Sequence, residues 1–546
     1  MKSGVEASIA SSERRKEPVK EIERKVVLIG GGIASLAAAV FLIRDGDIPG
    51  HNITILEESG VLGGALDGAG TPETGYVIRG GRMLESKYVC TYDLFSSIPV
   101  LDDSGTVTQE IFSWNDTMKT SSKSRLVRGG YRVDAPKYGL CENHVLTLER
   151  LAIEPESVLG NSSIADQFDP DFFETDFWLM WCTTFAFQPW HSAVEFKRYI
   201  VRFSHMIDGF NRLHGIMRTV YNQYDSMVRP LQKWLEQRDV RFRLNTRVTD
   251  LVSEENRDGK RVRRILYQCG ESAGELEVAG DDLVIVTLGS MTESSSFGSM
   301  QSAPVLQDTA NAPAWALWKQ IARGRPEFGR PTVFADHIKE SKWVSFTTTL
   351  RDPAFFRIVG DFTGNVPGEG GLITFAQSSW RLSIVLPHQP HFLSQPQDVS
   401  VFWGYGLSVD NRGDYVKRPM SECTGIEIMT ELLDHLWVGN ESTQILATSN
   451  CIPCMMPFIT SQFLRRERGD RPQVIPRGWR NLAFTGQFCE LRDDVVFTVE
   501  YSIRSAQTAV YRLLGLKRRL PPVYKGMHDP RVLFKAYRSL HDMGAS

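Results

Sequence analysis

Val26-Val27-Leu28-Ile29-Gly30-Gly31-Gly32-Ile33-Ala34-Ser35 is the stretch that decides the fold of this chain. Its four apolar residues, rich in β-branched side chains, predict a buried parallel strand. The small and apolar residues at 34–44 predict a helix directly after the glycines. Residues 52–57 predict a second strand that ends in an acid. A strand, a glycine turn, a helix and a second strand form the unit that begins a Rossmann-type sheet.

The glycine turn has the pattern of a dinucleotide-binding site. Gly30 permits a tight turn, and Gly32 lets the backbone approach a pyrophosphate, whose charge the first N–H groups of the helix bind. Ser35 occupies the third position, where a small side chain allows helix and strand to pack closely. Glu57 lies 22 residues past Ser35, where an acid binds the ribose, and Glu58 is its close competitor. The alternative is a chance glycine-rich turn.

Later glycines indicate FAD rather than NAD. Leu62-Gly63-Gly64-Ala65 is a small-residue turn of the kind that two-domain FAD proteins place beside the cofactor. Arg79-Gly80-Gly81-Arg82 adds glycines and two guanidiniums. A last predicted strand reaches Gly486, where such proteins close over the phosphates and the flavin. No second GxGxxG unit occurs in the sequence, which argues against a pyridine-nucleotide reductase.

The composition is that of an ordinary globular protein. The chain has 546 residues, 42% of them hydrophobic and 23% charged, enough for two to four structural units. The net charge of −3 and the lack of a sustained basic and aromatic stripe argue against nucleic-acid binding. Eight scattered cysteines and no signal peptide before the first apolar run predict a reduced, cytoplasmic protein. Cys451-Ile452-Pro453-Cys454 lacks further zinc ligands nearby, so we expect no metal.

The predicted fold class is α/β, a Rossmann-type FAD-binding domain with a mixed α+β substrate domain, a helical insertion and a C-terminal helical segment. Composition divides the chain into a mobile tail (1–24), a discontinuous FAD domain (25–150, 240–300 and 475–515), an aromatic-rich helical cap (151–239), a substrate domain (301–474) and a basic segment (516–546). The basic segment predicts an amphipathic helix. That helix either makes a peripheral contact with anionic lipid or packs on its own domain.

Several long blocks of sequence resemble one family. They are Arg79-Gly80-Gly81-Arg82, Thr184-Phe185-Ala186-Phe187-Gln188-Pro189-Trp190-His191, Tyr221-Asn222-Gln223-Tyr224-Asp225-Ser226, Gln389-Pro390-His391-Phe392 and Met456-Pro457-Phe458-Ile459-Thr460-Ser461-Gln462-Phe463. All look like the oleate hydratase family, also called myosin-cross-reactive antigen, over roughly residues 25–515. The resemblance implies an FAD-binding monomer or homodimer. Such an enzyme adds water to the cis-9 double bond of an oleate-like fatty acid, giving a 10-hydroxy acid without net redox change.

The resemblance also implies roles for individual residues. Tyr199 falls on the tyrosine proposed to protonate the alkene; the alternative is a core tyrosine. Gln223 and His391 fall on residues that hold the substrate carboxylate, and Thr460 is assigned to the substrate site. For Gln223 and His391 the alternatives are a helix-surface glutamine and a capped loop histidine. The full set of expected cofactor contacts is Gly30, Gly32, Ala34, Ser35, Glu57, Glu58, Gly63, Gly64, Arg82, Val248, Ser290, Gly486, Phe497 and Thr498.

The sequence departs from the family pattern at the proposed water-activating acid. Many members read Arg-Gly-Gly-Arg-Glu-Met, whereas this chain has Met83 in the glutamate position, followed by Leu84 and Glu85. Losing a general base typically costs roughly 10²–10⁴-fold in rate. Three explanations are open. Glu85 moves in from two residues along the loop and acts as the base, or backbone groups and the flavin polarise the water. In the third, the activity is weak or altered. We expect the activity to be retained.

The carboxylate site departs as well. The family often has Thr-x-Asn before Gln-Pro-His, whereas residues 385–391 read Val-Leu-Pro-His-Gln-Pro-His here. His388 and a nearby arginine are the candidates to replace the two missing polar contacts. Two other classes of function stay open at this point. They are an FAD-dependent oxidoreductase of the amine oxidase or desaturase type, and a non-catalytic flavin- and lipid-binding protein.

Overall fold

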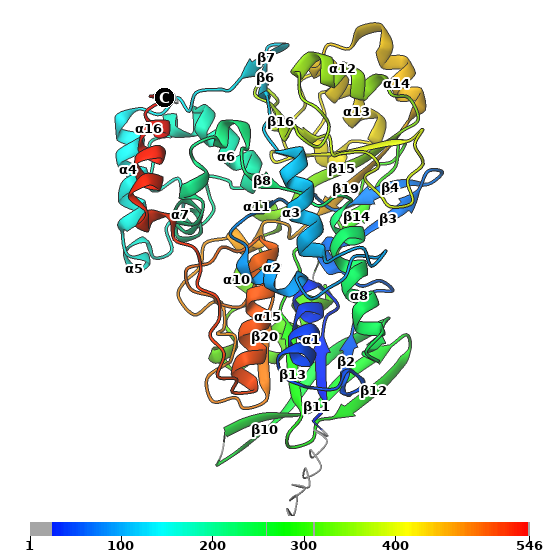
Figure 1. The fold of residues 1–546 in the computed structure, drawn as a ribbon, viewed down its shortest axis with the longest axis vertical. Helices are drawn as coiled ribbons and strands as arrows, with labels where there is room; N and C mark the ends of the chain where they lie inside the picture. The colour runs from blue at the N-terminus through cyan, green and yellow to red at the C-terminus, as the bar shows by residue number, and fades with distance from the viewer. Residues whose placement is uncertain (1–23, 258, 310–311, 544–546) are drawn as a thin grey trace, which may run out of the picture.

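A five-stranded parallel sheet forms the centre of the lower half of the molecule (Figure 1). The computed structural model describes residues 24–257, 259–309 and 312–543, so the predicted tail lies outside the described residues except for Arg24. In sheet order the strands are β20 (Leu482–Thr485), β13 (Leu283–Thr287), β1 (Val26–Ile29), β2 (Ile53–Leu56) and β9 (Arg241–Arg243). All neighbouring strands are parallel, which confirms the predicted α/β class.

Two helices pack together beside this sheet. Helix α1 (Ile33–Arg44) joins β1 to β2, and its alanines at 37–39 are fully buried. These small side chains let α15 (Val499–Leu513) pack closely against it. Helix α2 (Val89–Phe95) is fixed to α15 because the Glu500 carboxylate accepts the backbone N–H groups of Cys90 and Thr91 at 3.0 and 2.8 Å.

A separate antiparallel sheet of three strands lies below, formed by β10 (Thr246–Asn256), β11 (Gly259–Cys269) and β12 (Ser272–Glu277). Helix α9 (Pro313–Ile321) packs against β10. Helix α8 (Arg229–Glu236) follows the π-helical turn η6 (Tyr224–Val228).

An eight-stranded mixed sheet forms the upper part of the molecule. In order its strands are β14 (Ser296–Phe297), β19 (Ser449–Met456), β15 (Trp343–Leu350), β18 (Ser400–Gly406), β17 (Ser383–Val385), β16 (Leu372–Phe375), β6 (Ser124–Arg128) and β7 (Tyr131–Asp134). β6, β7 and β14 fall within segments predicted for the FAD domain, yet they belong to this sheet. Because four of the five residues of β6 are buried, this strand needs a neighbour, and β16 pairs with it through Thr374 and Leu126.

The aromatic-rich segment is largely helical, and this helical region, called the cap below, begins at α4, before residue 151 where the sequence analysis starts the cap. Its elements are α4 (Glu142–Ile153), α5 (Glu156–Leu159), η3 (Pro170–Glu174), α6 (Asp176–Phe185), α7 (Ala193–Arg202), η4 (Ser204–Met206) and η5 (Phe210–Arg212). Trp181 is buried among the rings of Phe177, Phe185, Phe196 and Phe210, with ring centroids 4.8–5.7 Å away. This ring cluster joins α6 to α7 and is part of the apolar core that runs through the described residues.

The C-terminal segment contains α16 (Pro530–Leu540), which lies beside the cap in Figure 1. Ala536 and Leu540 are buried, and α16 contacts η4 and η11 (Gly526–His528). The helix therefore packs on its own protein, while Phe534 and Tyr537 stay exposed. Among the described residues, no helix combines the length and the apolar character needed to cross a bilayer.

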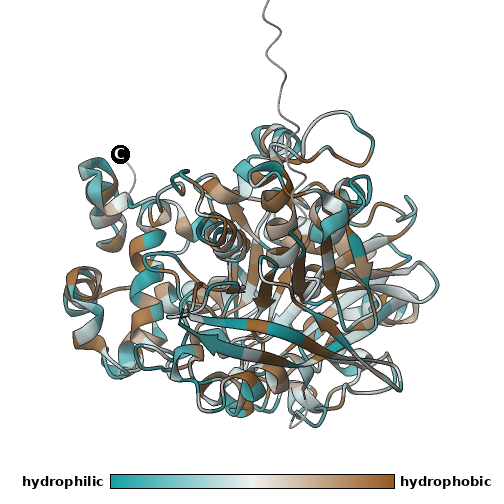
Figure 2. Ribbon diagram, turned by 90° about the horizontal axis from the view of Figure 1, so that it is seen from below, coloured by the Kyte–Doolittle hydropathy of each residue, from teal (hydrophilic) through white to brown (hydrophobic). Residues whose placement is uncertain are grey.

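The remaining elements connect these layers. They are η1 (Gly50–Asn52), η2 (Gly64–Leu66), β3 (Gly68–Thr71), β4 (Gly75–Ile78), β5 (Leu84–Glu85), α3 (Val107–Met118), β8 (Ile216–Met217), η7 (Pro326–Phe328), α10 (Thr332–Ala335), α11 (Ile338–Ser341), α12 (Ala354–Thr363), η8 (Met420–Glu422), α13 (Gly425–His435), η9 (Gly439–Glu441), α14 (Ser442–Thr448) and η10 (Ser461–Phe463). Figure 2 shows the central strands coloured as hydrophobic, whereas the outlying helices mix hydrophobic and hydrophilic residues. The apolar core therefore follows the sheets.

Candidate functional site

One cavity of this protein, here called the large cavity, opens at the carboxyl ends of four parallel strands. Residues just after β1, β2, β13 and β20 line it, among them Gly30, Glu57, Gly289 and Gly486. In open α/β sheets, ligands bind outside the carboxyl ends of the strands. The large cavity therefore lies where the sequence predicts a dinucleotide.

Glycines form a bare backbone cradle in this cavity. A Cβ on Gly31 would lie 2.7 Å from Leu62 Cδ2 and 2.9 Å from Glu57 Oε2. Gly64 has a φ of +56°, and its Cβ would lie 3.2 Å from the Cα of Gly32. A side chain at either position would collide with the protein's own atoms, so this part of the cavity wall stays bare backbone. Such a wall fits the phosphates of a dinucleotide such as FAD.

The predicted cofactor residues lie on the wall of the large cavity, with one exception. The residues on the wall are Gly30, Gly32, Ala34, Glu57, Glu58, Gly63, Gly64, Arg82, Val248, Ser290, Gly486, Phe497 and Thr498. Ser35 is fully buried behind the wall, and its Oγ lies 3.1 Å from Thr287 Oγ1. Its small side chain serves the packing of α1 on β13, and its role as a cofactor contact stays a prediction.

Three carboxylates surround one end of the large cavity. Glu57 Oε2 accepts the N–H of Gly31 at 2.5 Å, and Glu58 pairs with Arg247 at 2.6 Å. Glu293, which the sequence analysis missed, lines the same wall. Burial raises the pKa of Glu293 to about 7, and the negative charges of Glu58 and Glu57 add to this. Because no motif contains Glu293, only its position in the fold identifies it.

A second cavity, here called the small cavity, adjoins the large one. The two share Arg82, Phe497, Thr498 and Val499 as a common wall. Arg82 lies with its guanidinium carbon 5.2 Å from the centre of the Phe497 ring. Beyond this wall, the small cavity is lined mainly by aromatic and aliphatic side chains, among them Tyr88, Phe185, Tyr199, Phe203 and Ile216. An apolar chain could therefore lie directly beside a ligand in the large cavity.

Tyr199 presents a buried phenol to the small cavity. Its side chain is 1% exposed, and its hydroxyl donates to the carbonyl of Val496 at 2.6 Å. Burial raises the pKa of Tyr199 well above its ordinary value, and the charges of Glu195 and Asp494 raise it further. The phenol therefore keeps its proton at physiological pH and is available as an acid.

An ion-pair network fixes the helix that carries Tyr199. Glu195, on α7 and one turn before Tyr199, is fully buried and lies 2.9 Å from Arg466 and 2.8 Å from Arg471. The side chain of Ser192 caps the first turn of α7. These contacts hold the phenol at a defined place in the small cavity.

Met83 and Glu85 both line the small cavity, as predicted from the loop that carries them. The Glu85 carboxylate lies 2.7 Å from Arg202 and 3.4 Å from His205, and it accepts the N–H of Lys87 at 2.7 Å. Burial alone would raise the pKa of Glu85, but His205, Arg202 and the Lys87 N–H outweigh it and lower that pKa. Glu85 is thus a weakened base whose two oxygens are already engaged.

The predicted substrate-binding residues lie off the walls of both cavities. Gln223 donates from Nε2 to the carbonyl of Gly80 at 2.9 Å and so fixes the arginine–glycine loop. Thr460 donates to the carbonyl of Ser341 at 3.0 Å. His391 is 9% exposed, and its Nε2 has no partner among the described residues. The structure thus brings Tyr199, Met83 and Glu85 together, but not Gln223, His391 or Thr460.

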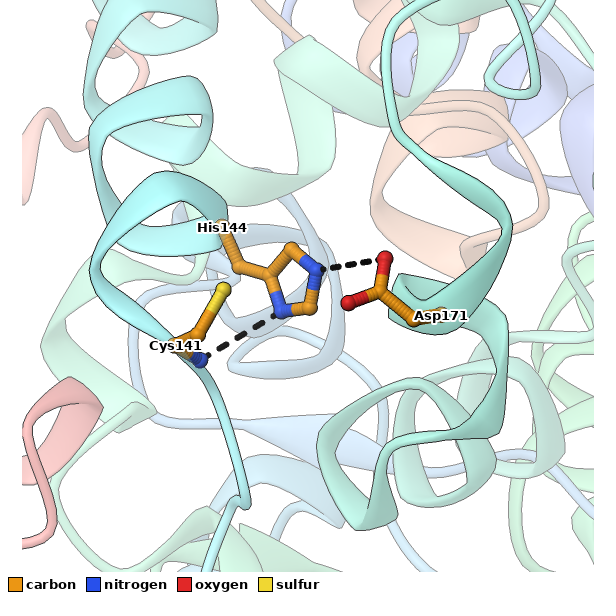
Figure 3. Close-up of side chains that lie close together, drawn as sticks. All are labelled: Cys141, His144 and Asp171. Atoms are coloured by element: carbon orange, nitrogen blue, oxygen red, sulfur yellow. Dashed lines mark hydrogen bonds and ion pairs between the residues drawn. The ribbon is translucent and has the colours of Figure 1, made fainter.

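Two clusters of possible metal ligands occur among the described residues, away from both cavities. They are Cys141 with His144 and Asp171, and Asp414 with Glu431 and His435. Figure 3 shows the His144 ring hydrogen-bonded through Nδ1 to the Cys141 N–H at 3.4 Å and through Nε2 to Asp171 at 3.2 Å. Both ring nitrogens thus serve to close the first turn of α4 against η3. Glu431 likewise accepts three backbone N–H groups at 414–416. The expected absence of a metal stays a prediction.

Comparison with known proteins identifies a family and two relatives that match almost the whole chain. The profile of the MCRA family matches residues 23–511. An oleate hydratase of Streptococcus pyogenes serotype M49 (strain NZ131) is 40% identical, over 97% of this chain and 92% of that protein. A linoleate hydratase of Lactiplantibacillus plantarum is 34% identical, over 95% and 99%.

Solved structures show the same fold at low sequence identity. A putrescine oxidase bound to putrescine has a TM-score of 0.53 at 12% identity, over 90% of this chain and 99% of the other. Cyclohexylamine oxidase from Brevibacterium oxydans IH-35A has a TM-score of 0.53 at 13% identity, over 91% and 100%. At this identity the likeness concerns the fold alone.

Proposed function

The chain belongs to the MCRA family, and from this membership we propose that it hydrates the cis double bond of unsaturated fatty acids with FAD bound in the large cavity. The family predicted from the sequence is thereby confirmed. The two relatives named as oleate and linoleate hydratases support the substrate class. The observation that carries the proposal is the small cavity, in which the Tyr199 phenol faces an apolar space that shares a wall with the large cavity.

The glycine cradle and its neighbours would hold the cofactor. The backbone at 30–32 and 63–64 would contact the pyrophosphate, and Glu57 or Glu58 the ribose. FAD bound there supplies its ring system and electrostatic field rather than redox chemistry, because adding water to an alkene transfers no electrons overall. Arg82 and Phe497 line both cavities, so each can contact the cofactor on one side and the substrate on the other.

Tyr199 is the proposed proton donor. Its O–H proton passes to one alkene carbon, the oxygen of a water bonds to the other, and a proton of that water replaces the one that Tyr199 lost. A phenol with a raised pKa is a weak acid, so the developing cation needs stabilisation. The rings of Phe185, Phe203 and Phe497, which line the small cavity, supply cation–π attraction.

Backbone groups are the proposed holders of the water. Met83 offers no proton acceptor, and Glu85 is engaged by Arg202 and His205. Within the described part of the chain, the backbone groups of Gly81 and Arg82 make no backbone hydrogen bonds of their own, and both residues line the small cavity. They can therefore orient a water molecule there. Of the alternatives left open by the sequence, this favours water polarised by backbone groups.

We further propose a peripheral contact of α16 with anionic membrane, where fatty acids reside. Leu533, Phe534 and Tyr537 are exposed, and Arg531 and Lys535 lie on the same helix. Exposed apolar side chains beside basic ones suit an anionic surface. Co-sedimentation with phosphatidylglycerol vesicles should exceed that with phosphatidylcholine vesicles; equal sedimentation would reject the contact.

Mass spectrometry of the products tests the main proposal. The FAD-loaded protein is incubated with oleate, linoleate and saturated stearate as a control. A mass gain of one water for the unsaturated acids only is expected. Oxygen consumption with flavin bleaching would instead support an oxidoreductase. Binding without any product would support a non-catalytic flavin- and lipid-binding protein.

A further inference from the structure

Cys141, His144 and Asp171 form a cluster of metal-binding donors at the start of the cap. Their sulfur, ring nitrogen and carboxylate oxygen all lie within 4.8 Å of one another. Figure 3 shows the sulfur and the carboxylate on opposite sides of the imidazole. Two donors bound to one zinc ion in a tetrahedron lie about 3.5 Å apart, so shifts of roughly 1 Å bring all three donors to a single ion.

The imidazole of His144 is held in a fixed orientation. Its ring packs edge-on against Phe172, with the ring centroids 5.5 Å apart. Nε2 lies 3.2 Å from Asp171 Oδ1, and a metal-binding histidine typically donates its second N–H to a carboxylate in this way. Nδ1 accepts the N–H of Cys141 at 3.4 Å, which is long for a hydrogen bond, so a metal can displace this weak contact. Nδ1 is therefore the ring nitrogen available to a metal.

Cys141 is an unusual residue for its position, the N-cap of α4. Serine, threonine, aspartate and asparagine are the strong N-cap residues, whereas a thiol is a weak hydrogen-bond acceptor. Of the eight cysteines, six are buried and only Cys141 and Cys269 are exposed. A helix N-terminus also stabilises a thiolate, the form of cysteine that binds metals. Capping alone does not account for a cysteine here, but metal binding does.

The surroundings of the cluster favour a cation. Glu142 follows Cys141 in the first turn of α4, and Asn143 donates to the Asp169 carboxylate at 3.1 Å. These two acids add negative charge beside the three donors. Cys141 and Asp171 are exposed, so water can reach the fourth position of a tetrahedral ion. A thiolate and a carboxylate together balance the charge of a divalent metal.

We propose that Cys141, His144 and Asp171 bind one divalent cation of the zinc class through Sγ, Nδ1 and a carboxylate oxygen, with water as the fourth ligand. Sulfur and nitrogen donors suit Zn²⁺, whereas Mg²⁺ and Ca²⁺ prefer oxygen ligands. The thiol gives up its proton to solvent when the metal binds. The ion joins the start of α4 to η3, and α4 packs against α7, which carries Tyr199, so the metal braces the cap. The inference is independent of the proposed function and replaces the sequence expectation of no metal, which considered the CxxC motif alone.

Zinc binding by single-residue variants tests the site. The FAD-loaded full chain is treated with a chelator, dialysed against micromolar Zn²⁺ and analysed for metal by mass spectrometry. The unmodified protein should bind one more zinc ion per chain than C141S, in which the affinity should fall by at least roughly 100-fold. C141S should fold normally because serine is a preferred N-cap residue. D171N, whose amide oxygen can still accept the His144 N–H, should weaken zinc binding as well.

C269S is the matched control, because Cys269 is the other exposed cysteine and lies on β11. It should bind zinc like the unmodified protein. Cobalt gives a second readout, because Co²⁺ in this site should show a thiolate-to-cobalt charge-transfer band that C141S lacks and C269S keeps. Equal zinc binding by C141S and the unmodified protein, or a cobalt complex without that band, overturns the inference.

Discussion

Replacing Tyr199 with phenylalanine removes one oxygen from the small cavity and should abolish most of the hydration activity. A positioned general acid contributes roughly 10²–10⁴-fold to a rate, so kcat should fall within that range. The substitution also removes the hydrogen bond to the Val496 carbonyl at 2.6 Å. Leaving a buried carbonyl unpaired costs about 1–3 kcal/mol, which is less than the total stability of an ordinary domain. The variant should therefore stay folded and still bind FAD.

The assay is the initial rate of hydroxy acid formation by mass spectrometry at saturating oleate, with flavin content and urea unfolding measured on the same samples. Tyr88 provides a demanding comparison. It lines the same cavity and is likewise a buried tyrosine, with its side chain 4% exposed. Y88F should cost less than about tenfold if it only shapes the cavity. If Y199F keeps its rate within tenfold while Y88F loses it, Tyr88 is the proton donor and our assignment is refuted.

Three further predictions concern the cofactor site and the loop beside it. G31A should weaken FAD binding at least about tenfold in a fluorescence titration, because the new Cβ would lie 2.7 Å from Leu62 Cδ2; unchanged affinity would contradict the cradle. Burial raises the pKa of Glu293 from 4.5 to about 7, so in FAD-free protein the free energy of unfolding should fall as pH rises through this interval. In E293Q the urea-unfolding curves should lose that dependence, and persistence of the full slope would rule out Glu293 as its source. E85Q should lower the free energy of unfolding by about 3 kcal/mol because it breaks a buried pair with Arg202. Normal stability with lost turnover would instead identify Glu85 as the base.

The nucleotide-binding unit could be predicted from the sequence because its determinants are local. The strand at 26–29, the glycines and the helix after them are contiguous, and each residue type has one structural role there. The same holds for Gly486 at the end of the last parallel strand. Residues of this kind lie on the wall of the large cavity almost without exception.

Long-range contacts explain what the sequence could not provide. Ser35 lies behind the wall because Thr287, 252 positions away, packs against it. The sequence offered Glu85 as one candidate for the base, but Arg202 and His205 of the cap engage its carboxylate. Glu293 belongs to no motif, and its raised pKa arises from burial beside acids of another strand. In each case, a partner distant in sequence sets the charge or the exposure of the residue.

The wall formed by Arg82, Phe497, Thr498 and Val499 has two faces, and each faces a different cavity. Phe497 is held at a φ of +70°, a conformation costly for a bulky residue, so the wall is under strain before either ligand arrives. If one ligand supplies the free energy needed to order these four residues, the second ligand binds to a wall that is already ordered. Thermodynamic reciprocity then requires that FAD tighten fatty acid binding by the same factor as the fatty acid tightens FAD binding. The dissociation constants of FAD and of the fatty acid, each measured with and without the other ligand, would test this equality.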